Sequence, residues 1–329
     1  MTTSLIDSQS VLAIDIGSAN TRAVLFDVVD GEYHFIASGM MPTTINAPYN
    51  DAREGILLAV ERLEEITGRV FHDPSAFLMI PSRADGSGVD RLVITYSAGP
   101  ELRVVTTGLL PDVSLDSAQR LAATSYGRVV ESIGLNDRRP PEAQLDAILR
   151  AKPDVVIVVG GSENGATRSV MKMVDLTGLV CRLLPHEQRP AVLYAGNQAI
   201  AGKGKESLEK LTTVTTASNV RPSVDNEDLR PAQDALALVT TQVRKNQIGG
   251  LHSLSQMSAA GPMPTAQAFG RMMRFLSLRS PARNVLGVDV GASYVKVVLL
   301  RYDRLGKDHR ILDKAAEKLR KRDPKDVVQ

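Results

Sequence analysis

The sequence predicts an α/β fold of two duplicated lobes, in which mixed sheets are flanked by helices. Three observations indicate this class. Short apolar runs alternate with segments of helical period. The run at 154–161 is continuously apolar, which is typical of a parallel strand buried on both faces. The strand–turn–strand pattern at 11–27 recurs at 285–301, so the chain contains an internal repeat.

Individual elements follow from periodicity and from the residues that bound them. Strands are predicted where short apolar runs end at turn residues: 11–16, 22–28, 33–39, 76–80, 91–97, 102–108, 154–161, 190–195, 285–291 and 295–300. Helices are predicted where apolar residues recur every three or four positions: 51–67, 114–133, 142–151, 166–177, 231–243 and 264–277. The first helix has Asp51 as its expected N-cap and Gly68 as its stop. Residues 249–264, rich in Gly and Pro, are predicted to be a loop.

The repeat also sets the expected organisation into lobes. Residues 1–210 would form the first lobe, 211–283 a helical connecting region, and 284–329 the opening β-hairpin of a second lobe plus a basic helical tail. Because about 30 residues follow Leu300, the second lobe is expected to be incomplete. Three explanations stay open: a truncated chain, a second chain that supplies the rest, or a degenerate lobe with a scaffold role.

Composition excludes several classes of function. The net charge of +2 is too small to indicate a nucleic-acid partner. The single cysteine, Cys181, lies in an apolar stretch and is expected to be a buried thiol in a reducing compartment. The five histidines are scattered without metal-ligand spacing. We see no signal peptide and no run of 18 apolar residues, so a cytoplasmic protein without a membrane span is expected.

The turn that occurs in both copies of the repeat is the candidate binding site. Both copies read apolar strand, Asp, apolar residue, Gly, short polar turn and second strand. Backbone N–H groups of such a turn can hold phosphate oxygens, and Gly allows close approach. An aspartate beside a phosphate needs a Mg²⁺ between them, often bound through water. Asp15 and Asp289 are therefore the candidate metal residues, expected to face each other across a cleft. The alternative is a duplication that keeps the fold without the ligand.

Several stretches resemble known motifs. IDIGSANTRAVLFD and VDVGASYVKVV resemble the two phosphate motifs of the actin-like ATPase superfamily, which includes acetate and sugar kinases, heat-shock chaperones and actin. More narrowly, the chain resembles the glutamate mutase L family, which is associated with adenosylcobalamin-dependent mutases. This resemblance rests on an ordered series of motifs: IDIGSANTRA, VTTGLLPDVSLDSAQRLA, PDVVIVVGGSENGATRSV, PAVLYAGNQA, SNVRPSVDNEDLRPAQDAL and MPTAQAF.

The resemblance implies an actin-like, ribonuclease H-like fold that binds ATP or ADP with Mg²⁺. It also implies a chaperone or reactivating role toward a cobalamin-dependent mutase. By motif position, the residues expected to face phosphates and Mg²⁺ are Asp15, Gly17, Ser18, Asn20, Thr21, Asp289, Gly291 and Ser293. The pair Gly160 and Gly161 is a further nucleotide-binding candidate, with an ordinary strand–helix turn as the alternative.

The second phosphate motif departs from the family pattern. Ala292 stands in place of a second glycine, and Lys296 in place of a later acidic residue. This departure argues against hydrolysis more than against binding, so the chain is at most a weak ATPase. A catalytically inactive actin-like scaffold that self-associates or recruits partners is the main alternative. A small-molecule kinase ranks last, because no general base can be assigned.

Overall fold

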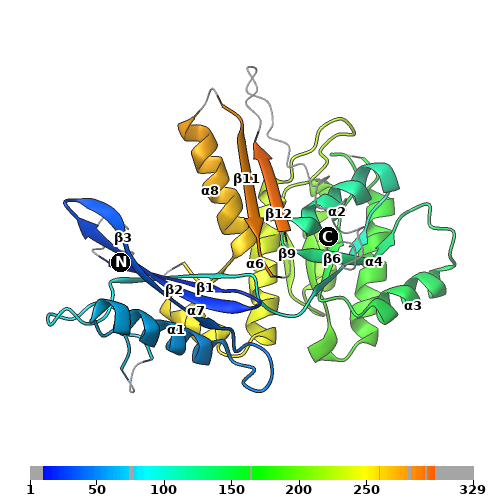
Figure 1. The fold of residues 1–329 in the computed structure, drawn as a ribbon. Coiled ribbons are helices and arrows are strands. Elements are labelled where there is room, and N and C mark those ends of the chain that lie inside the picture. The colour runs from blue at the N-terminus through cyan, green and yellow to red at the C-terminus, as the bar shows by residue number, and fades with distance from the viewer. Residues whose placement is uncertain are drawn as a thin grey trace, which may run out of the picture. The chain divides into compact units, whose positions relative to one another are not determined.

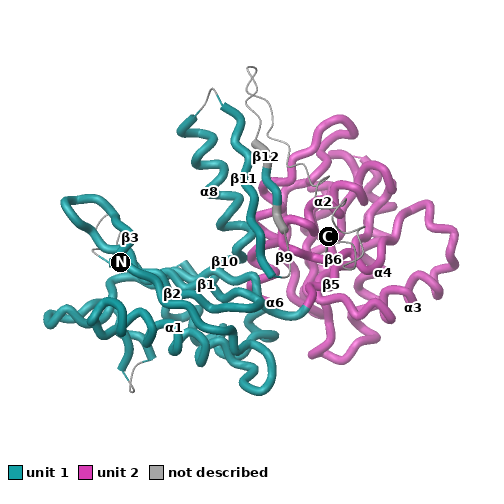
Figure 2. Tube along the Cα trace, viewed as in Figure 1, with its two compact units in different colours: residues 1–100, 244–329 teal, residues 101–243 magenta. Residues whose placement is uncertain are grey.

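The computed structural model describes residues 10–73, 77–163, 165–258, 260–280, 283–292 and 295–300. The chain divides into two compact units (Figure 2). Unit 1 contains residues 1–100 and 244–329, and unit 2 contains residues 101–243. The lobe boundaries expected at 210 and 283 concern a different division, so they stay predictions.

The main sheet of unit 1 is mixed and five-stranded, with the order β10-β4-β1-β2-β3. Its strands are β1 (Ser10–Ile16), β2 (Asn20–Val29), β3 (Glu32–Pro42), β4 (Arg91–Tyr96) and β10 (Met263–Pro264). The first three form the predicted antiparallel meander, whereas β4 pairs with β1 in parallel and β10 with β4 in parallel. Strand β4 is thus brought beside β1 from about 80 residues later in the sequence, and β10 is brought beside β4 from the far side of unit 2 in the sequence.

One face of this sheet is covered by helix α1 (Ala52–Thr67), which lies along it (Figure 1), and α1 contacts helix α7 (Leu251–Met257). Asp51 caps α1 by accepting from the N–H of Arg53, and Gly68 ends the helix in the left-handed conformation, as predicted. The apolar face of α1 joins Leu12, Ile14 and Ile16 of β1 in a single core.

The repeat is visible in the second hairpin, β11 (Val285–Val290) and β12 (Val295–Leu300). Asp15 pairs across its hairpin with Arg22, and Asp289 pairs in the same way with Lys296. The hairpin forms a separate two-stranded sheet whose inner face packs on helix α8 (Thr265–Arg279), beside which it lies in Figure 1.

The outer face of β11 differs sharply from the matching face of β1. In the shared register, Leu12, Ile14 and Ile16 correspond to Leu286, Val288 and Val290. The first three are at most 1% exposed, whereas the second three are 63%, 55% and 73% exposed. Within the described residues, no helix covers this outer face as α1 covers the matching face of β1. The incomplete second lobe stays a prediction.

The sheet of unit 2 is entirely parallel, in the order β6-β5-β7-β8-β9. Its strands are β5 (Leu102–Thr107), β6 (Gly127–Ile133), β7 (Val155–Val158), β8 (Ala191–Tyr194) and β9 (Val214–Thr216). Its helices are α2 (Asp116–Ala123), α3 (Pro141–Ala151), α4 (Thr167–Leu183), α5 (Ala201–Leu208) and α6 (Arg230–Gln247), which runs past the unit boundary.

Two separate cores cover the two faces of this sheet. Helices α2 and α6 share one core, and α3, α4 and α5 share the other. Helices on both faces of a parallel sheet make a doubly wound arrangement. Cys181 of α4 is buried, as predicted, and burial raises the pKa of its thiol to about 11. The two sheets flanked by helices confirm the predicted α/β fold class.

Three element predictions were wrong. The helix expected at 114–133 ends at Ala123, because Tyr126 has a positive φ of 55° and residues 127–133 form strand β6. Residues 77–80 of the strand expected at 76–80 form no ladder; Met79 makes single backbone bonds to Phe71 and Val89. The loop expected at 249–264 contains α7, whose Leu251 and Leu254 are buried.

Candidate functional site

The candidate site of unit 1 is the turn between β1 and β2. Asp15 lies one residue before the end of β1 and is half-buried. The turn is closed by a hydrogen bond from the N–H of Gly17 to the carbonyl of Asn20, at 2.9 Å. A Cβ on Gly17 would lie 2.6 Å from that carbonyl oxygen, so the turn requires glycine there.

Two threonine hydroxyls hold the Asp15 carboxylate. Thr95, its parallel partner on β4, donates to Oδ1 at 2.7 Å. Thr265, the first residue of α8, donates to the same oxygen at 3.0 Å. The site therefore combines the turn, the neighbouring strand and the N-terminus of a helix from the far end of the chain.

The second carboxylate oxygen has a different environment. Within the described part of the chain, Asp15 Oδ2 accepts no hydrogen bond, while Oδ1 accepts two. A carboxylate oxygen left open beside a tight turn is a suitable acceptor for a water bound to Mg²⁺. The first turn of α8 adds a positive dipole end, which favours anions nearby.

The other predicted residues of this turn differ in accessibility. Ser18 is half-buried and Asn20 is exposed. Thr21 is fully buried, and its hydroxyl lies 3.3 Å from that of Thr43. Asp15 and Arg22 form one cross-strand pair and Ile16 and Thr21 the next, so Thr21 faces the α1 side of the sheet. The structure gives Thr21 a packing role, and phosphate contact there stays a prediction.

The second predicted phosphate turn lies on the β11–β12 hairpin of the same unit. Asp289 is half-buried and Gly291 is exposed. Within the described residues, the Asp289 carboxylate has no hydrogen bond or ion pair, so no side-chain bond joins it to Asp15, Thr95 or Thr265. Ser293 lies outside the described residues. A cleft between Asp15 and Asp289 stays a prediction.

Gly160 and Gly161 belong to unit 2, whereas the Asp15 turn belongs to unit 1. Both have positive φ angles, 109° and 74°. A Cβ on Gly160 would lie 2.9 Å from Leu109 Cγ, and one on Gly161 would lie 3.1 Å from Val170 Cγ2. Close packing of the strand–helix turn therefore accounts for both glycines, and their role in nucleotide binding stays a prediction.

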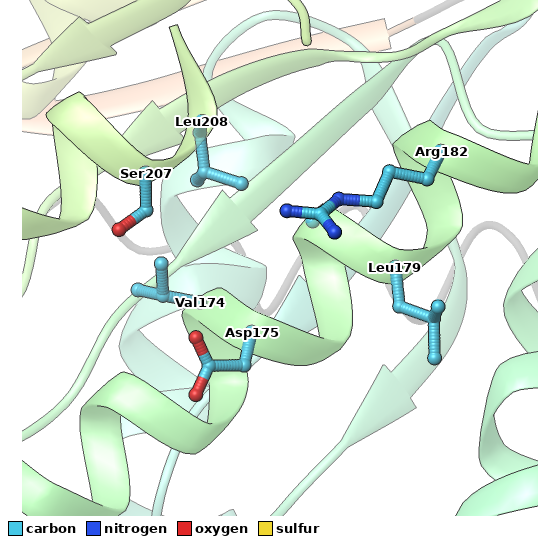
Figure 3. Close-up of a pocket in the computed structure, with 7 residues that line it drawn as sticks. Val174, Asp175, Leu179, Arg182, Ser207 and Leu208 are labelled. Atoms are coloured by element: carbon cyan, nitrogen blue, oxygen red, sulfur yellow. The ribbon is translucent and has the colours of Figure 1, made fainter. Parts of the chain in front are cut away.

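A groove of about 370 Å³ lies between α4 and α5, and Figure 3 shows residues that line it. Figure 3 shows Asp175, Leu179 and Arg182 on α4 and Ser207 and Leu208 on α5. A Cβ on Gly178 would meet Leu208 at 3.3 Å, so the groove follows from a close helix contact. It contains no predicted site residue.

Metal clusters and membrane-spanning helices were also considered over the described residues. Over these residues, no three His, Cys, Asp or Glu side chains gather as a metal site would require. In the same part of the chain, none of the helices has the length and apolar character needed to span a membrane.

Comparison with known proteins assigns the chain to a family. A family model described as MutL protein matches residues 11–323, which is nearly the whole chain. The chain belongs to the MutL protein family. It is 21% identical over 294 residues to Protein MutL of Clostridium tetanomorphum, covering 87% of this chain and 56% of that protein. This MutL family member thus spans about half the length of the curated relative that it matches.

Two solved structures show a weaker likeness. A glycerol dehydratase reactivase has 16% identity and a TM-score of 0.20, over 48% of this chain and 28% of that chain. A diol dehydratase-reactivating factor in nucleotide-free form has 14% identity and a TM-score of 0.18, over 67% and 32%. At TM-scores this low, no statement about the MutL family member rests on either likeness.

Sequence reasoning missed the two threonines that hold Asp15. Thr95 lies within a strand that was predicted correctly, and a parallel register with β1 would have placed it beside Asp15. Thr265 lies within the motif MPTAQAF, one residue after the two-residue strand β10. No local signal in this MutL family member pairs that motif with a turn 250 positions earlier.

Proposed function

We propose that this MutL family member is a nucleotide-binding protein that holds ATP or ADP with Mg²⁺ at the Asp15 turn. We also propose that it acts as a chaperone or reactivating partner of an adenosylcobalamin-dependent mutase, as the family resemblance implies. Retention of the nucleotide without fast turnover fits the altered second turn, where Lys296 replaces an acidic residue. The proposed function is therefore nucleotide binding, with at most slow hydrolysis.

One observation supports binding most strongly. The Asp15 carboxylate presents an open Oδ2 at a tight glycine turn, while its other oxygen is held by Thr95 and Thr265. Within the described residues, the Asp15 carboxylate forms no ion pair, and its two hydrogen bonds use only Oδ1. A hydrated Mg²⁺ with its phosphate would use the remaining oxygen and the negative charge. Arg22, its exposed cross-strand neighbour, adds a positive charge on the same face of the sheet.

The test is calorimetric titration of MgADP and MgATP into the full chain, with two matched variants. Asp15→Asn keeps an oxygen that the two threonines can reach but removes the charge. Asp30→Asn changes an aspartate in the β2–β3 turn, where a positive φ of 54° also suits asparagine. We expect Asp15→Asn to weaken Mg-nucleotide binding by about 100-fold, the equivalent of about 2.7 kcal/mol, and Asp30→Asn to leave it unchanged.

A second experiment addresses the partner. The wild-type chain and Asp15→Asn would be incubated with an adenosylcobalamin-dependent mutase that has been inactivated by turnover. Recovery of mutase activity that needs MgATP and is lost in Asp15→Asn would support the reactivating role. Mg-nucleotide binding without any effect on the mutase would restrict the function to nucleotide binding. Absence of binding at millimolar nucleotide would favour the inactive scaffold.

A further inference from the structure

We propose that Thr95 and Thr265 are positioning residues of the Asp15 site, and that Thr265 transmits nucleotide occupancy to helix α8 and the second hairpin. This inference rests on the proposed function and adds a regulatory path to it. Neither threonine lies in a predicted phosphate motif.

The orientation of Asp15 follows from how its two oxygens are used. Thr95 and Thr265 both donate to Oδ1, so that oxygen has two hydrogen bonds and Oδ2 is turned away from both donors. A carboxylate with one oxygen fixed in this way cannot rotate about χ2 without losing a bond. The pair therefore fixes the direction in which Oδ2 meets a hydrated Mg²⁺.

Thr265 has a second connection that Thr95 lacks. It is the first residue of α8, whose N-cap, Pro264, provides no side-chain cap. The hydrogen bond to Asp15 thus places a carboxylate at the positive end of a 15-residue helix. Nearby, the two-residue strand β10 ties the same end of α8 to β4 through Met263 and Pro264.

Helix α8 also carries the second hairpin, through Phe269 and Met273, which follow Thr265 by four and eight residues on the same side of the helix. A Cβ on Gly287 of β11 would meet the Met273 side chain and would lie 2.8 Å from Phe269 Cζ, so the hairpin backbone rests directly on α8. Met273 and Val298 of β12 are buried together at this contact. A change at the first turn of α8 therefore reaches the hairpin that carries Asp289 through packed atoms.

A hydrated Mg²⁺ bound at Oδ2 would draw charge from the carboxylate and so weaken the bond that Oδ1 accepts from Thr265. The phosphate that accompanies the metal would place new negative charge near the same helix end. The first turn of α8 would respond to both changes. Thr95, within β4, would hold the carboxylate in either state.

The test is hydrogen exchange of the full chain with and without MgADP, together with calorimetric affinities. In the wild type, MgADP should slow exchange at the turn 17–20 and alter it along 265–290. Thr265→Val should keep the effect at the turn, lose it along 265–290, and bind MgADP about tenfold more weakly, as expected for one lost hydrogen bond to a charged group. Affinity for ADP in EDTA should not change.

Three further variants make the outcome decisive. Thr265→Ser restores the hydroxyl and should restore both readouts. Thr95→Val should weaken MgADP binding to a similar degree but keep the response along 265–290, which separates orientation of Asp15 from transmission. Thr67→Val removes a hydroxyl that donates to Leu63 in α1 and should behave as the wild type.

The outcomes also separate the inference from the function on which it rests. A wild-type chain with no MgADP effect at the turn overturns the proposed function. Two results would overturn the inference alone, given a wild-type MgADP effect at the turn. The first is wild-type hydrogen exchange along 265–290 and wild-type MgADP affinity in Thr265→Val. The second is a Thr265→Ser variant in which neither readout returns to that of the wild type.

Discussion

The hydroxyl of Thr265 donates to the carboxylate of Asp15 at 3.0 Å, although the two residues are 250 positions apart in the sequence. Thr265 begins helix α8, which follows the whole of unit 2 in the sequence. The contact therefore joins the C-terminal part of unit 1 to its N-terminal turn. The geometry of the Asp15 carboxylate therefore depends on a residue from a distant part of the chain.

Gly17→Ala should disable the turn without unfolding the unit. A Cβ at this position would lie 2.6 Å from the Asn20 carbonyl oxygen, so the turn must open and its N–H groups must shift. We expect MgADP affinity to fall at least about tenfold, while the thermal unfolding temperature changes little. Gly270→Ala, where a Cβ meets nothing within 4 Å, is the control. Unchanged affinity in Gly17→Ala would place the phosphate elsewhere.

Gly39→Ala should destabilise unit 1 by a packing mechanism. A Cβ on Gly39 would overlap the Ala59 carbonyl and would lie 2.8 Å from the Leu63 nitrogen, so α1 could not approach β3. The expected loss in the free energy of unfolding is about 3 kcal/mol, at the upper end for overpacking. Urea unfolding measures it. Gly202→Ala in α5, where a Cβ meets nothing within 4 Å, should be neutral or stabilising. Equal stabilities for the two variants would contradict the close α1–β3 contact.

Asp51 should give the unfolding of α1 a pH dependence. Hydrogen bonding from the Arg53 side chain is the largest cause that lowers the pKa of Asp51 below its ordinary value of 3.8. A carboxyl whose pKa is lower in the folded state stabilises it above the ordinary pKa, and that contribution is lost as the pH falls through the folded value. Asp51→Asn keeps a cap but removes the titration.

The comparison needs urea unfolding of both proteins at pH 7 and pH 3. We expect the wild type to be the more stable at pH 7 and the difference to shrink at pH 3. A difference in the free energy of unfolding that is the same at both pH values would show that the Asp51–Arg53 pairing adds no stability.

Prediction from sequence succeeded where local signals were complete. Helix α1 was predicted with both of its ends because Asp51 and Gly68 are strong local caps. The second hairpin was predicted because its pattern repeats that of the first. Strand β6 was missed because Val129 and Val130 also fit the period of the preceding helix. Only pairing with β5, and the positive φ of Tyr126, separates the two elements.

The candidate site was predictable in part for the same reason. Asp15 and Gly17 could be found because they belong to a motif. Thr95 reaches Asp15 through the register of two parallel strands, and Thr265 reaches it because the chain returns to unit 1 after unit 2. Neither arrangement leaves a local sequence pattern. The burial of Thr21 could not be predicted either. Its side chain faces α1 because of its place in the alternation of β2, and that place depends on the strand register.

A crystal structure of the full chain grown with MgADP would test the Asp15 site at the level of single atoms. We expect the phosphates at the turn 17–20, with a metal-bound water that donates to Asp15 Oδ2 and with Thr95 still bonded to Oδ1. Nucleotide bound away from this turn, or an Asp15 Oδ2 paired with a protein group in the complex, would contradict this expectation.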